Sequence, residues 1–483
     1  MNVTNKRWPD DYFLEERKKV LAMWPTGKEV DLDEATAYHK RMPKTKNAAL
    51  KDREAKEKGI TYLWPSLGTG TIAAHKELLL YMQKEGEVDF LTSYIDSLTR
   101  NCRFKAAEEE LNKSKKTGKA TLNGFPIVIH GIEGCRQIVE AVNLPVIFLG
   151  PTPDARLTHE IALAGGHTGY SGGPLISFWN YTKDIPVEQI IHNYQYANRL
   201  MGYYEEKGVA ILYCVSGAMP SISPPSLMIA PEIIEVLIAA EQGVKHIRLN
   251  GWGQGNIVQD IAYIRTFEEL TRQYLDKFGY NDVRTTTYSV NPTGRFPTDP
   301  DRVFALIAYF TLVGVLARVQ GLGSRTIDEA HHIPTKEGTA QSFRCARMLI
   351  NMLGPQKLDI LDLQAVNTES DFIKREVKAI LDKVLEMGDG DVITGTKRAV
   401  DVGILDQPYA TSQLVQGRVM GVKDHEGAAR FFDFGNLPFE HDIKEFHRQK
   451  ICRRQEQIGK QVDYDTVIKD LTAISEGGIL PLS

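Results

Sequence analysis

The stretch from Val209 to Asn250 contains one complete repeat of the pattern that decides the fold. It begins with the apolar run Val209-Ala-Ile-Leu-Tyr-Cys-Val215 and ends with His246-Ile-Arg-Leu-Asn250. Between these runs, Ala230-Pro-Glu232 opens a helical segment that Gly243 closes, with proline near the start and glycine just past the end. The first run is apolar at consecutive rather than alternate positions, which is typical of a strand in a parallel sheet covered on both faces.

The same strand-then-helix unit recurs along the chain. Its β-rich runs start roughly 20 to 40 residues apart, which is the length of one such unit. They are Ile60–Trp64, Val88–Thr92, Phe125–His130, Leu144–Leu149, Pro174–Phe178, Val209–Val215, His246–Asn250, Thr285–Val290 and Arg318–Leu322. Eight or more units in series favour a closed (β/α)8 TIM barrel, an α/β fold, over an open doubly wound sheet. These nine runs exceed the eight places of a barrel, so at least one lies elsewhere. Pro174–Phe178 and Arg318–Leu322 have the weakest strand patterns.

Helix signals lie between the runs. Asp299-Pro300-Asp301 opens a helix over Arg302–Val315, and a further helix is predicted over Cys135–Val142. The apolar stretch Val303–Ala317 is about 15 residues long, shorter than the roughly 20 residues that a membrane span needs. We therefore expect a buried helix there and no membrane segment.

The two ends of the chain differ from the barrel in their residue pattern. Residues 1–58 are charged, and their lysine-rich part is interrupted by acidic residues, which predicts a solvated N-terminal helical arm rather than a nucleic-acid patch. The barrel is expected over residues 59–364. Residues 365–483 lose the strand rhythm and predict an α-rich C-terminal extension packed on the barrel or on a partner.

Composition excludes several classes of protein. The chain has 483 residues, is 42% hydrophobic and 25% charged, and carries a net charge of −4, so neither nucleic acid nor an anionic membrane is expected as a partner. Its first residues have no apolar signal-peptide core, and its five cysteines lack C-x-x-C spacing. Export, a disulfide framework and a structural zinc site are therefore not expected. The prediction is a cytoplasmic protein.

In a barrel the active site forms at the carboxyl ends of the strands, so the loops there carry the chemistry. Gly68, in Ser66-Leu-Gly-Thr-Gly70, would let the backbone approach a ligand closely. Asn250–Asn256 reads G-x-G-x-G, not the dinucleotide fingerprint, and is either a polar rim over a flat cofactor or a plain turn. Asp328–His332 is not H-E-x-x-H, which favours capping or hydrogen bonding over metal ligation. No metal site is predicted, and these patterns assign no catalytic residue.

Short motifs along the chain resemble the large (epsilon) subunit of glutamate mutase. They include Leu122-Asn-Gly-Phe-Pro126, Gly134-Cys-Arg136, Gly279-Tyr-Asn-Asp282, Ile333-Pro-Thr-Lys-Glu337 and Phe434-Gly-Asn-Leu-Pro-Phe439. Each motif is short, but the matches run in order from about Trp24 to the C-terminus. Their order and spacing identify the chain as similar to this family over almost its whole length.

The resemblance implies a TIM barrel whose mouth is closed by a small cobalamin-binding subunit. That partner carries a cobalt-ligating D-x-H-x-x-G motif, which this sequence lacks. In the family, adenosylcobalamin supplies a radical that abstracts a substrate hydrogen, and glutamate and 3-methylaspartate interconvert. The protein supplies positioning and shielding from water. The resemblance also implies a homodimer of large subunits within a heterotetramer.

The substrate-side positions of the family are mostly changed. Of three arginines that hold the substrate carboxylates, only Arg100 is kept, and the other two positions fall on Ser66 and Leu149. The alternative role for Arg100 is a salt bridge to Asp96, one helical turn away.

Two further substrate positions are also replaced. A family glutamate that meets the substrate amino group falls on Ser171, and a substrate-binding tyrosine falls on Ser177, or on Phe178 after a one-residue shift. Tyr181 is kept.

The positions that the resemblance implies for the adenosyl group are better kept. Asn123 is retained, Arg325 replaces a lysine, and Glu329 matches a glutamate that meets the ribose. Gly68 belongs to the same side, whereas Gly321 replaces a second lysine. The cofactor implied is adenosylcobalamin, with its cobalt ligated mainly through the small subunit.

The replaced arginines and glutamate change which substrate the site can bind. An arginine–carboxylate contact contributes about 1.5–3 kcal/mol, and an unpaired buried charge costs several kcal/mol more. Without two arginines and the glutamate, binding of glutamate would weaken by orders of magnitude. We therefore expect a small-molecule substrate with one carboxylate, held by Arg100, and without an ammonium group.

Two alternatives remain at this point. The chain could be a true glutamate mutase with rearranged contacts, through Arg156 or Lys183. It could also be a degenerate barrel that acts as a scaffold for a cobalamin protein. The retained Asn123 and Glu329, with a cation at Arg325, argue against the scaffold.

Overall fold

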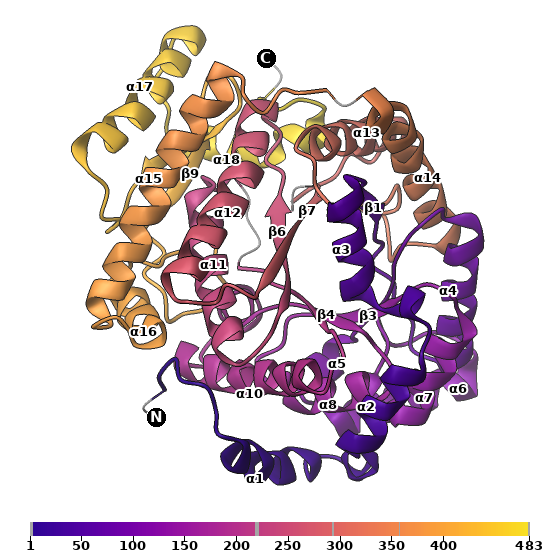
Figure 1. The fold of residues 1–483 in the computed structure, drawn as a ribbon. Coiled ribbons are helices and arrows are strands. Elements are labelled where there is room, and N and C mark those ends of the chain that lie inside the picture. Colours follow the sequence, from indigo (N-terminus) through magenta and orange to yellow (C-terminus); the bar gives the residue numbers. More distant parts are fainter. Residues whose placement is uncertain (1–2, 218–221, 292–293, 357, 482–483) are drawn as a thin grey trace.

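The computed structural model describes residues 3–217, 222–291, 294–356 and 358–481. Eight parallel strands form its main sheet, in the order β1-β8-β7-β6-β5-β4-β3-β2 (Figure 1). The strands are β1 (Tyr62–Leu63), β2 (Leu91–Tyr94), β3 (Val146–Leu149), β4 (Gly169–Ser171), β5 (Leu212–Cys214), β6 (His246–Trp252), β7 (Arg284–Val290) and β8 (Gly321–Leu322).

The sheet curls round so that its two ends meet. Between β1 and β2, the backbone N–H of Asp89 donates to the Leu63 carbonyl at 2.9 Å, and the N–H of Tyr94 donates to the Leu67 carbonyl at 2.6 Å. These bonds take the place of a regular ladder at the seam. The predicted (β/α)8 barrel is confirmed.

Two predicted strands are wrong and one was missed. Phe125–His130 lies mostly in helix α7 (Ile127–Ala141), which starts after Pro126, and Pro174–Phe178 forms α9 (Pro174–Ile176) and the start of a π-helix, η3 (Ser177–Tyr181). In both places a proline starts a buried helix that is apolar enough to resemble a strand. The missed strand, β4, has only three residues and no apolar run. Arg318–Leu322 does contain a barrel strand, β8.

Helices surround the strands. They are α4 (Ile72–Glu85), α5 (Ser97–Arg100), α6 (Phe104–Thr117), α7, α8 (Arg156–Ala164), α10 (Val187–Glu206), α11 (Ser226–Glu241), α12 (Ile257–Lys277), α13 (Pro300–Leu316) and α14 (Lys336–Leu353). The predicted helix over Arg302–Val315 is α13, and the side chain of Asp299 caps it. Among the described residues, no helix is long and apolar enough to cross a membrane.

Helix α11 begins before its expected start signal and contains Pro231 in its interior. Proline has no N–H to donate to the carbonyl four residues earlier, which here belongs to Leu227. The side-chain amide of Gln407 donates to that carbonyl at 2.6 Å. A residue of the C-terminal part therefore replaces the hydrogen bond that proline removes.

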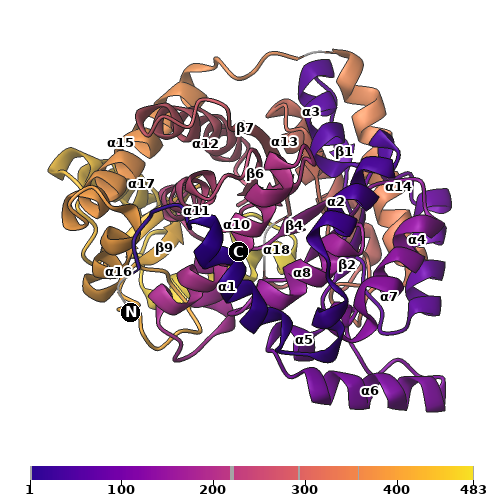
Figure 2. The ribbon, with the colours of Figure 1, turned by 60° about the horizontal axis from the view of Figure 1, so that its bottom comes forward.

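The N-terminal residues form α1 (Asp10–Leu21), η1 (Pro25–Glu29), α2 (Leu32–Arg41), η2 (Lys44–Lys46) and α3 (Ala48–Lys58). Helix α3 lies beside β1 in both views (Figures 1 and 2). It is not the solvated arm that was predicted, because Asp52 is buried against the barrel and the Ala48 N–H donates to Thr168 just before β4. Lys56 and Lys58 are exposed, which is why the sequence resembled a solvated helix, but Lys51 lies over the rings of Tyr62 and Phe90.

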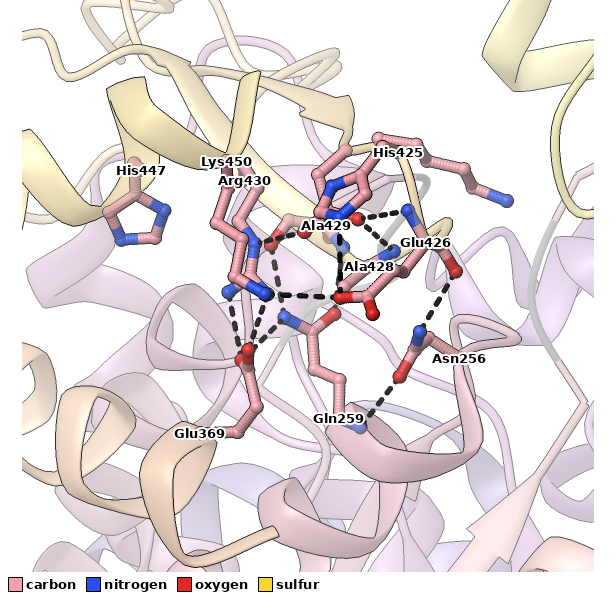
Figure 3. A network of polar contacts seen from close by, with 12 residues as sticks. Asn256, Gln259, Glu369, His425, Glu426, Ala428, Ala429, Arg430, His447 and Lys450 are labelled. Atoms are coloured by element: carbon pink, nitrogen blue, oxygen red, sulfur yellow. Dashed lines mark hydrogen bonds and ion pairs between the residues drawn. The ribbon is translucent and has the colours of Figure 1, made fainter. Parts of the chain in front are cut away.

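The C-terminal residues form η4 (Gly354–Gln356), α15 (Gln364–Met387), α16 (Val392–Val402), a hairpin of β9 (Met420–Lys423) and β10 (Ala429–Asp433), α17 (His441–Ile458) and α18 (Tyr464–Glu476). In Figures 1 and 2 this orange-to-yellow region lies beside α11 and α12. The side chain of Gln259 in α12 makes two hydrogen bonds with the backbone of Ala429, and Arg430 pairs with Glu369 and Asp424 (Figure 3). Buried polar contacts thus join the hairpin to the barrel helices.

Candidate active site

A cavity of about 240 Å³ lies at the carboxyl ends of the strands. Each of the eight strands, or the loop directly after it, contributes to its wall. The lining residues are Trp64, Ser66, Tyr94, Leu149, Pro151, Ser171, Gly172, Ile176, Tyr181, Cys214, Ser216, Arg248, Asn250, Trp252, Tyr288, Val290, Ser324, Arg325, Thr326, Glu329 and Pro334. This is where barrel enzymes carry their active sites.

The cavity brings together most of the site residues expected from the sequence. Those in its wall are Ser66, Leu149, Ser171, Tyr181, Arg325 and Glu329. Four others, Arg100, Ser177, Asn123 and Gly68, lie outside the wall.

Arg100 lies directly behind the wall, at the end of α5. Its guanidinium carbon is 5.4 Å from the ring centre of Tyr94 and 5.2 Å from that of Tyr181, and both rings line the cavity. Within the described residues Arg100 forms no ion pair, and its Nε has no hydrogen-bond acceptor. The alternative salt bridge to Asp96 is not formed, because Asp96 caps α5 by accepting from the N–H groups of Leu98 and Thr99.

Ser177 points away from the cavity. Its hydroxyl donates to the Gly173 carbonyl at 2.6 Å and lies 3.1 Å from the hydroxyl of Tyr194 in α10. Phe178, the position after a one-residue shift, is fully buried as well. The π-helical turn thus directs this side chain toward Tyr194, and a substrate contact at Ser177 stays a prediction.

Of the residues expected to meet an adenosyl group, Arg325 and Glu329 line the cavity and Asn123 lies outside its wall. Arg325 and Glu329 are 3.1 Å apart and partly exposed, and both line the cavity. Asn123 is exposed, and its side-chain oxygen accepts from the Ser97 N–H at 3.0 Å.

Gly68 has a packing role in the structure. A Cβ at this position would lie 2.8 Å from the Tyr94 carbonyl oxygen and 3.1 Å from the Cα of Gly124. Close approach of two loops to the end of β2 thus requires a glycine here. This close contact accounts for the glycine, and a role of Gly68 in cofactor binding stays a prediction.

Arg248 is a charged residue of the cavity that the sequence reading missed. It is fully buried in β6, and its Nη2 donates to Asp52 of α3. Its guanidinium carbon is 4.5 Å from the ring centre of Trp64 and 4.9 Å from that of Phe90. An arginine between two apolar residues of a buried strand needs a buried partner, and Arg248 lies between Ile247 and Leu249. Its partner could not be read from the sequence, since Asp52 lies 196 positions away.

The segment Asn250–Asn256 spans the end of β6 and the turn into α12. Asn256 caps α12 by accepting from the Gln259 N–H, which makes the segment a strand-to-helix turn. Asn250 and Trp252 line the cavity, and the Asn250 amide donates to the Ser216 hydroxyl at 3.3 Å. The same segment therefore forms a polar part of the cavity wall.

Two buried carboxyl groups support the loops around the cavity. Glu235 accepts from the N–H groups of Leu175 at 2.8 Å and Ser216 at 3.2 Å, and Glu232 accepts from Asn250 N–H at 3.1 Å. Burial raises the pKa of both carboxyl groups well above their usual range, and the charge of Glu235 raises that of Glu232 further. Both groups are therefore favoured in the neutral form, and they anchor α9, the segment after β5 and the end of β6.

The histidine-containing motif Asp328–His332 has the hydrogen-bonding role expected of it. His331 Nε2 lies 2.8 Å from the Thr298 carbonyl, and Asp328 accepts from the N–H and hydroxyl of Thr335.

A second acidic and histidine cluster, Asp424, His425 and Glu426, lies in the β9–β10 hairpin (Figure 3). Arg430 and Lys450 pair with its two carboxylates.

Comparison with known proteins shows the family to which the chain belongs. The model of the family "Methylaspartate mutase E chain (MutE)" matches residues 42–481. The glutamate mutase epsilon subunit of Desulfitobacterium hafniense (strain Y51) is 40% identical over 479 residues, covering 99% of this chain and 98% of the relative. That of Treponema denticola is 41% identical over 479 residues with the same coverage, and that of Yersinia enterocolitica is 38% identical over 483 residues, covering 99% of both chains. The chain therefore belongs to the methylaspartate mutase E chain family and is a subunit of a mutase, an isomerase.

Proposed function

We propose that this chain is the large subunit of an adenosylcobalamin-dependent carbon-skeleton mutase that acts on a small monocarboxylate in place of glutamate. The observation that carries the proposal is the wall of the cavity. At the three positions where the resemblance implies charged contacts to glutamate, it presents the uncharged residues Ser66, Leu149 and Ser171.

The proposed partner is a small cobalamin-binding subunit with a D-x-H-x-x-G motif. The relatives are named epsilon subunits and the family is named an E chain, which are names for one chain of a larger enzyme. Two large and two small subunits would form a heterotetramer, with each small subunit closing one barrel mouth.

The rim of the cavity fits an adenosyl group. Glu329 offers a carboxylate that can accept hydrogen bonds from a pair of ribose hydroxyls, and Arg325, 3.1 Å away, holds it in place. Asn123 is exposed, and its side-chain oxygen accepts from the Ser97 N–H. When bound, adenosylcobalamin would supply the radical chemistry. The chain itself would orient the substrate and exclude water from the barrel.

Charge balance argues against glutamate as the substrate. Glutamate brings two carboxylates and an ammonium group, and each group left unpaired in a desolvated site costs several kcal/mol. Arg100 is the cation next to the cavity without an ion-pair partner among the described residues. One free cation suits one substrate carboxylate.

The rearranged-contact alternative gains no support at Arg156. Its guanidinium makes two hydrogen bonds to the Asp154 carboxylate, at 2.8 and 2.6 Å, and it does not line the cavity. The scaffold alternative is disfavoured by the adenosyl-type rim at Arg325 and Glu329.

Reconstitution with the small subunit and adenosylcobalamin tests the proposal. EPR spectroscopy should detect a paramagnetic cobalt signal when a suitable monocarboxylate is added and none with L-glutamate. Formation of 3-methylaspartate from glutamate at an ordinary rate would refute the altered substrate. Tight cofactor binding without a signal from any candidate acid would favour the scaffold. The large subunit alone should bind cobalamin poorly, because the proposal assigns the cobalt ligand to the small subunit.

A further inference from the structure

We infer that Arg248, paired with Asp52, binds an uncharged oxygen atom of the substrate at the floor of the cavity. The inference deepens the proposed function, on which it rests, because it gives the chemical class of the substrate's second polar group. That class is a monocarboxylate whose other end carries an amide, carbonyl or hydroxyl oxygen.

Two of the three guanidinium nitrogens of Arg248 have no hydrogen-bond acceptor among the described residues. Its Nη2 is engaged by Asp52, but its Nε and Nη1 are buried and donate to no acceptor among the described residues. A buried arginine with unpaired N–H groups is costly unless something accepts from them. Arg248 is one of the residues that line the cavity, so a bound molecule can supply the missing acceptor.

The space around the guanidinium is shaped to keep it at the cavity floor. The rings of Trp64 and Phe90 lie 4.5 and 4.9 Å from its central carbon. A Cβ at Gly321 of β8 would lie 3.2 Å from its Nη1. A side chain at position 321 would therefore push the guanidinium of Arg248 from its present place.

The charge of Arg248 is already balanced. The Asp52 carboxylate is buried, accepts from Arg248, and also accepts from the Thr286 hydroxyl. A substrate carboxylate on Arg248 would leave this buried cluster with a net negative charge, which is costly in a dry interior. A neutral oxygen accepts the same N–H groups without that cost.

The remaining polar groups of the floor are also neutral. Asn250 donates its amide N–H to the Ser216 hydroxyl, and its oxygen accepts no hydrogen bond among the described residues. Both residues line the cavity together with Arg248. The floor thus offers donors at Arg248 and an acceptor at Asn250, which suits a primary amide. Arg100, which has no ion-pair partner in the described part of the chain, remains for the carboxylate.

Three acids of equal chain length test the inference by isothermal titration of the full-length chain. They are glutaramate (one carboxylate, one amide), glutarate (two carboxylates) and pentanoate (one carboxylate, an apolar end). The wild type should bind glutaramate at least about tenfold more tightly than either of the others, a difference of about 1.4 kcal/mol. Equal or tighter binding of glutarate would overturn the inference, as would binding of none of the three at millimolar concentration.

Two variants assign the selectivity to the buried pair. Arg248→Met should abolish the preference for glutaramate over pentanoate, and Arg248→Lys should keep part of it. Asp52→Asn leaves the positive charge of Arg248 unbalanced, so the ratio of glutarate to glutaramate affinity should rise at least about tenfold. Unchanged ratios in Arg248→Met and in Asp52→Asn would show that the pair only holds the barrel together.

A matched control separates folding from recognition. Arg454 forms a buried ion pair with Asp470 in the C-terminal region, away from the cavity. Arg454→Met should lower thermal stability without altering the affinity ratios. EPR of the reconstituted complex keeps the two proposals apart: absence of a cobalt signal with intact selectivity would reject the proposed reaction and leave the role of Arg248 standing.

Discussion

Gly150 keeps open the space that Arg100 occupies, so Gly150→Ala tests whether Arg100 binds the substrate carboxylate. Gly150 follows β3 and has a φ of 140°, a conformation that residues with side chains rarely adopt. A Cβ here would lie 2.8 Å from Cδ of Arg100. Alanine should therefore displace Arg100 from its place behind Tyr94 and Tyr181.

The substitution has two costs that can be separated. Backbone strain should lower the free energy of unfolding by about 1–2 kcal/mol. Loss of a charge-assisted contact to a carboxylate should cost about 1.5–3 kcal/mol of binding, or about tenfold to a hundredfold in Kd. Gly208→Ala is the matched control, because Gly208 has a φ of 78° but nothing within 4 Å of its Cβ. It carries the strain alone.

Isothermal titration with glutaramate provides the assay. Gly150→Ala should weaken binding by the factor given above, whereas Gly208→Ala should leave it unchanged at a similar loss of stability. In an Arg100→Met background, Gly150→Ala should cause no further loss of affinity. Equal losses in both backgrounds, or unaltered affinity in the single variant, would refute the reasoning.

Three further outcomes concern stability. Burial lowers the pKa of His75 to about 3 and that of His167 to about 4. The stability that their neutral forms contribute should therefore be complete above about pH 6.5 and be lost as the pH falls toward 4. A melting temperature that stays constant from pH 7 to 4.5 would contradict this. The raised pKa of Glu232 means that its ionisation favours the unfolded chain above about pH 4.5. The melting temperature of Glu232→Gln relative to the wild type should therefore increase as the pH rises from 5 to 8. A difference that stays constant over this range would contradict the prediction. Gln407→Leu should lower the free energy of unfolding in urea by about 1–3 kcal/mol, because the Leu227 carbonyl loses its donor. Adding Pro231→Ala should restore the lost stability, because alanine supplies a helical N–H to that carbonyl. If stability is not restored, the missing hydrogen bond is not the cause of the loss.

Much of the barrel could be predicted because its signals are local. Apolar runs such as Val209–Val215 and the capped helix after Asp299 have the strand and helix patterns within their own residues. The errors occurred where local pattern and packing disagree. Phe125–His130 is rich in β-forming residues, yet most of it lies in a buried helix, and the short strand Gly169–Ser171 is held by its neighbours on both sides.

The candidate site was predictable only in part. Residues at the ends of barrel strands, or in the segments that follow them, reach the cavity as expected. They are Ser66, Leu149, Ser171 and Tyr181. Ser177 does not line the cavity, because it lies in a π-helical turn that residue types do not indicate.

The sequence by itself determined the repeat of strands and helices, and through its ordered motifs the family, because both are properties of residues near one another in the chain. Tertiary structure alone decided which charges meet. In the sequence Arg248 lies between Ile247 and Leu249, and only closure of the barrel brings it against Asp52 of the N-terminal helix α3. Buried polar groups must find partners wherever the fold places them. The polarity of the cavity floor is therefore set by residues that are distant in sequence.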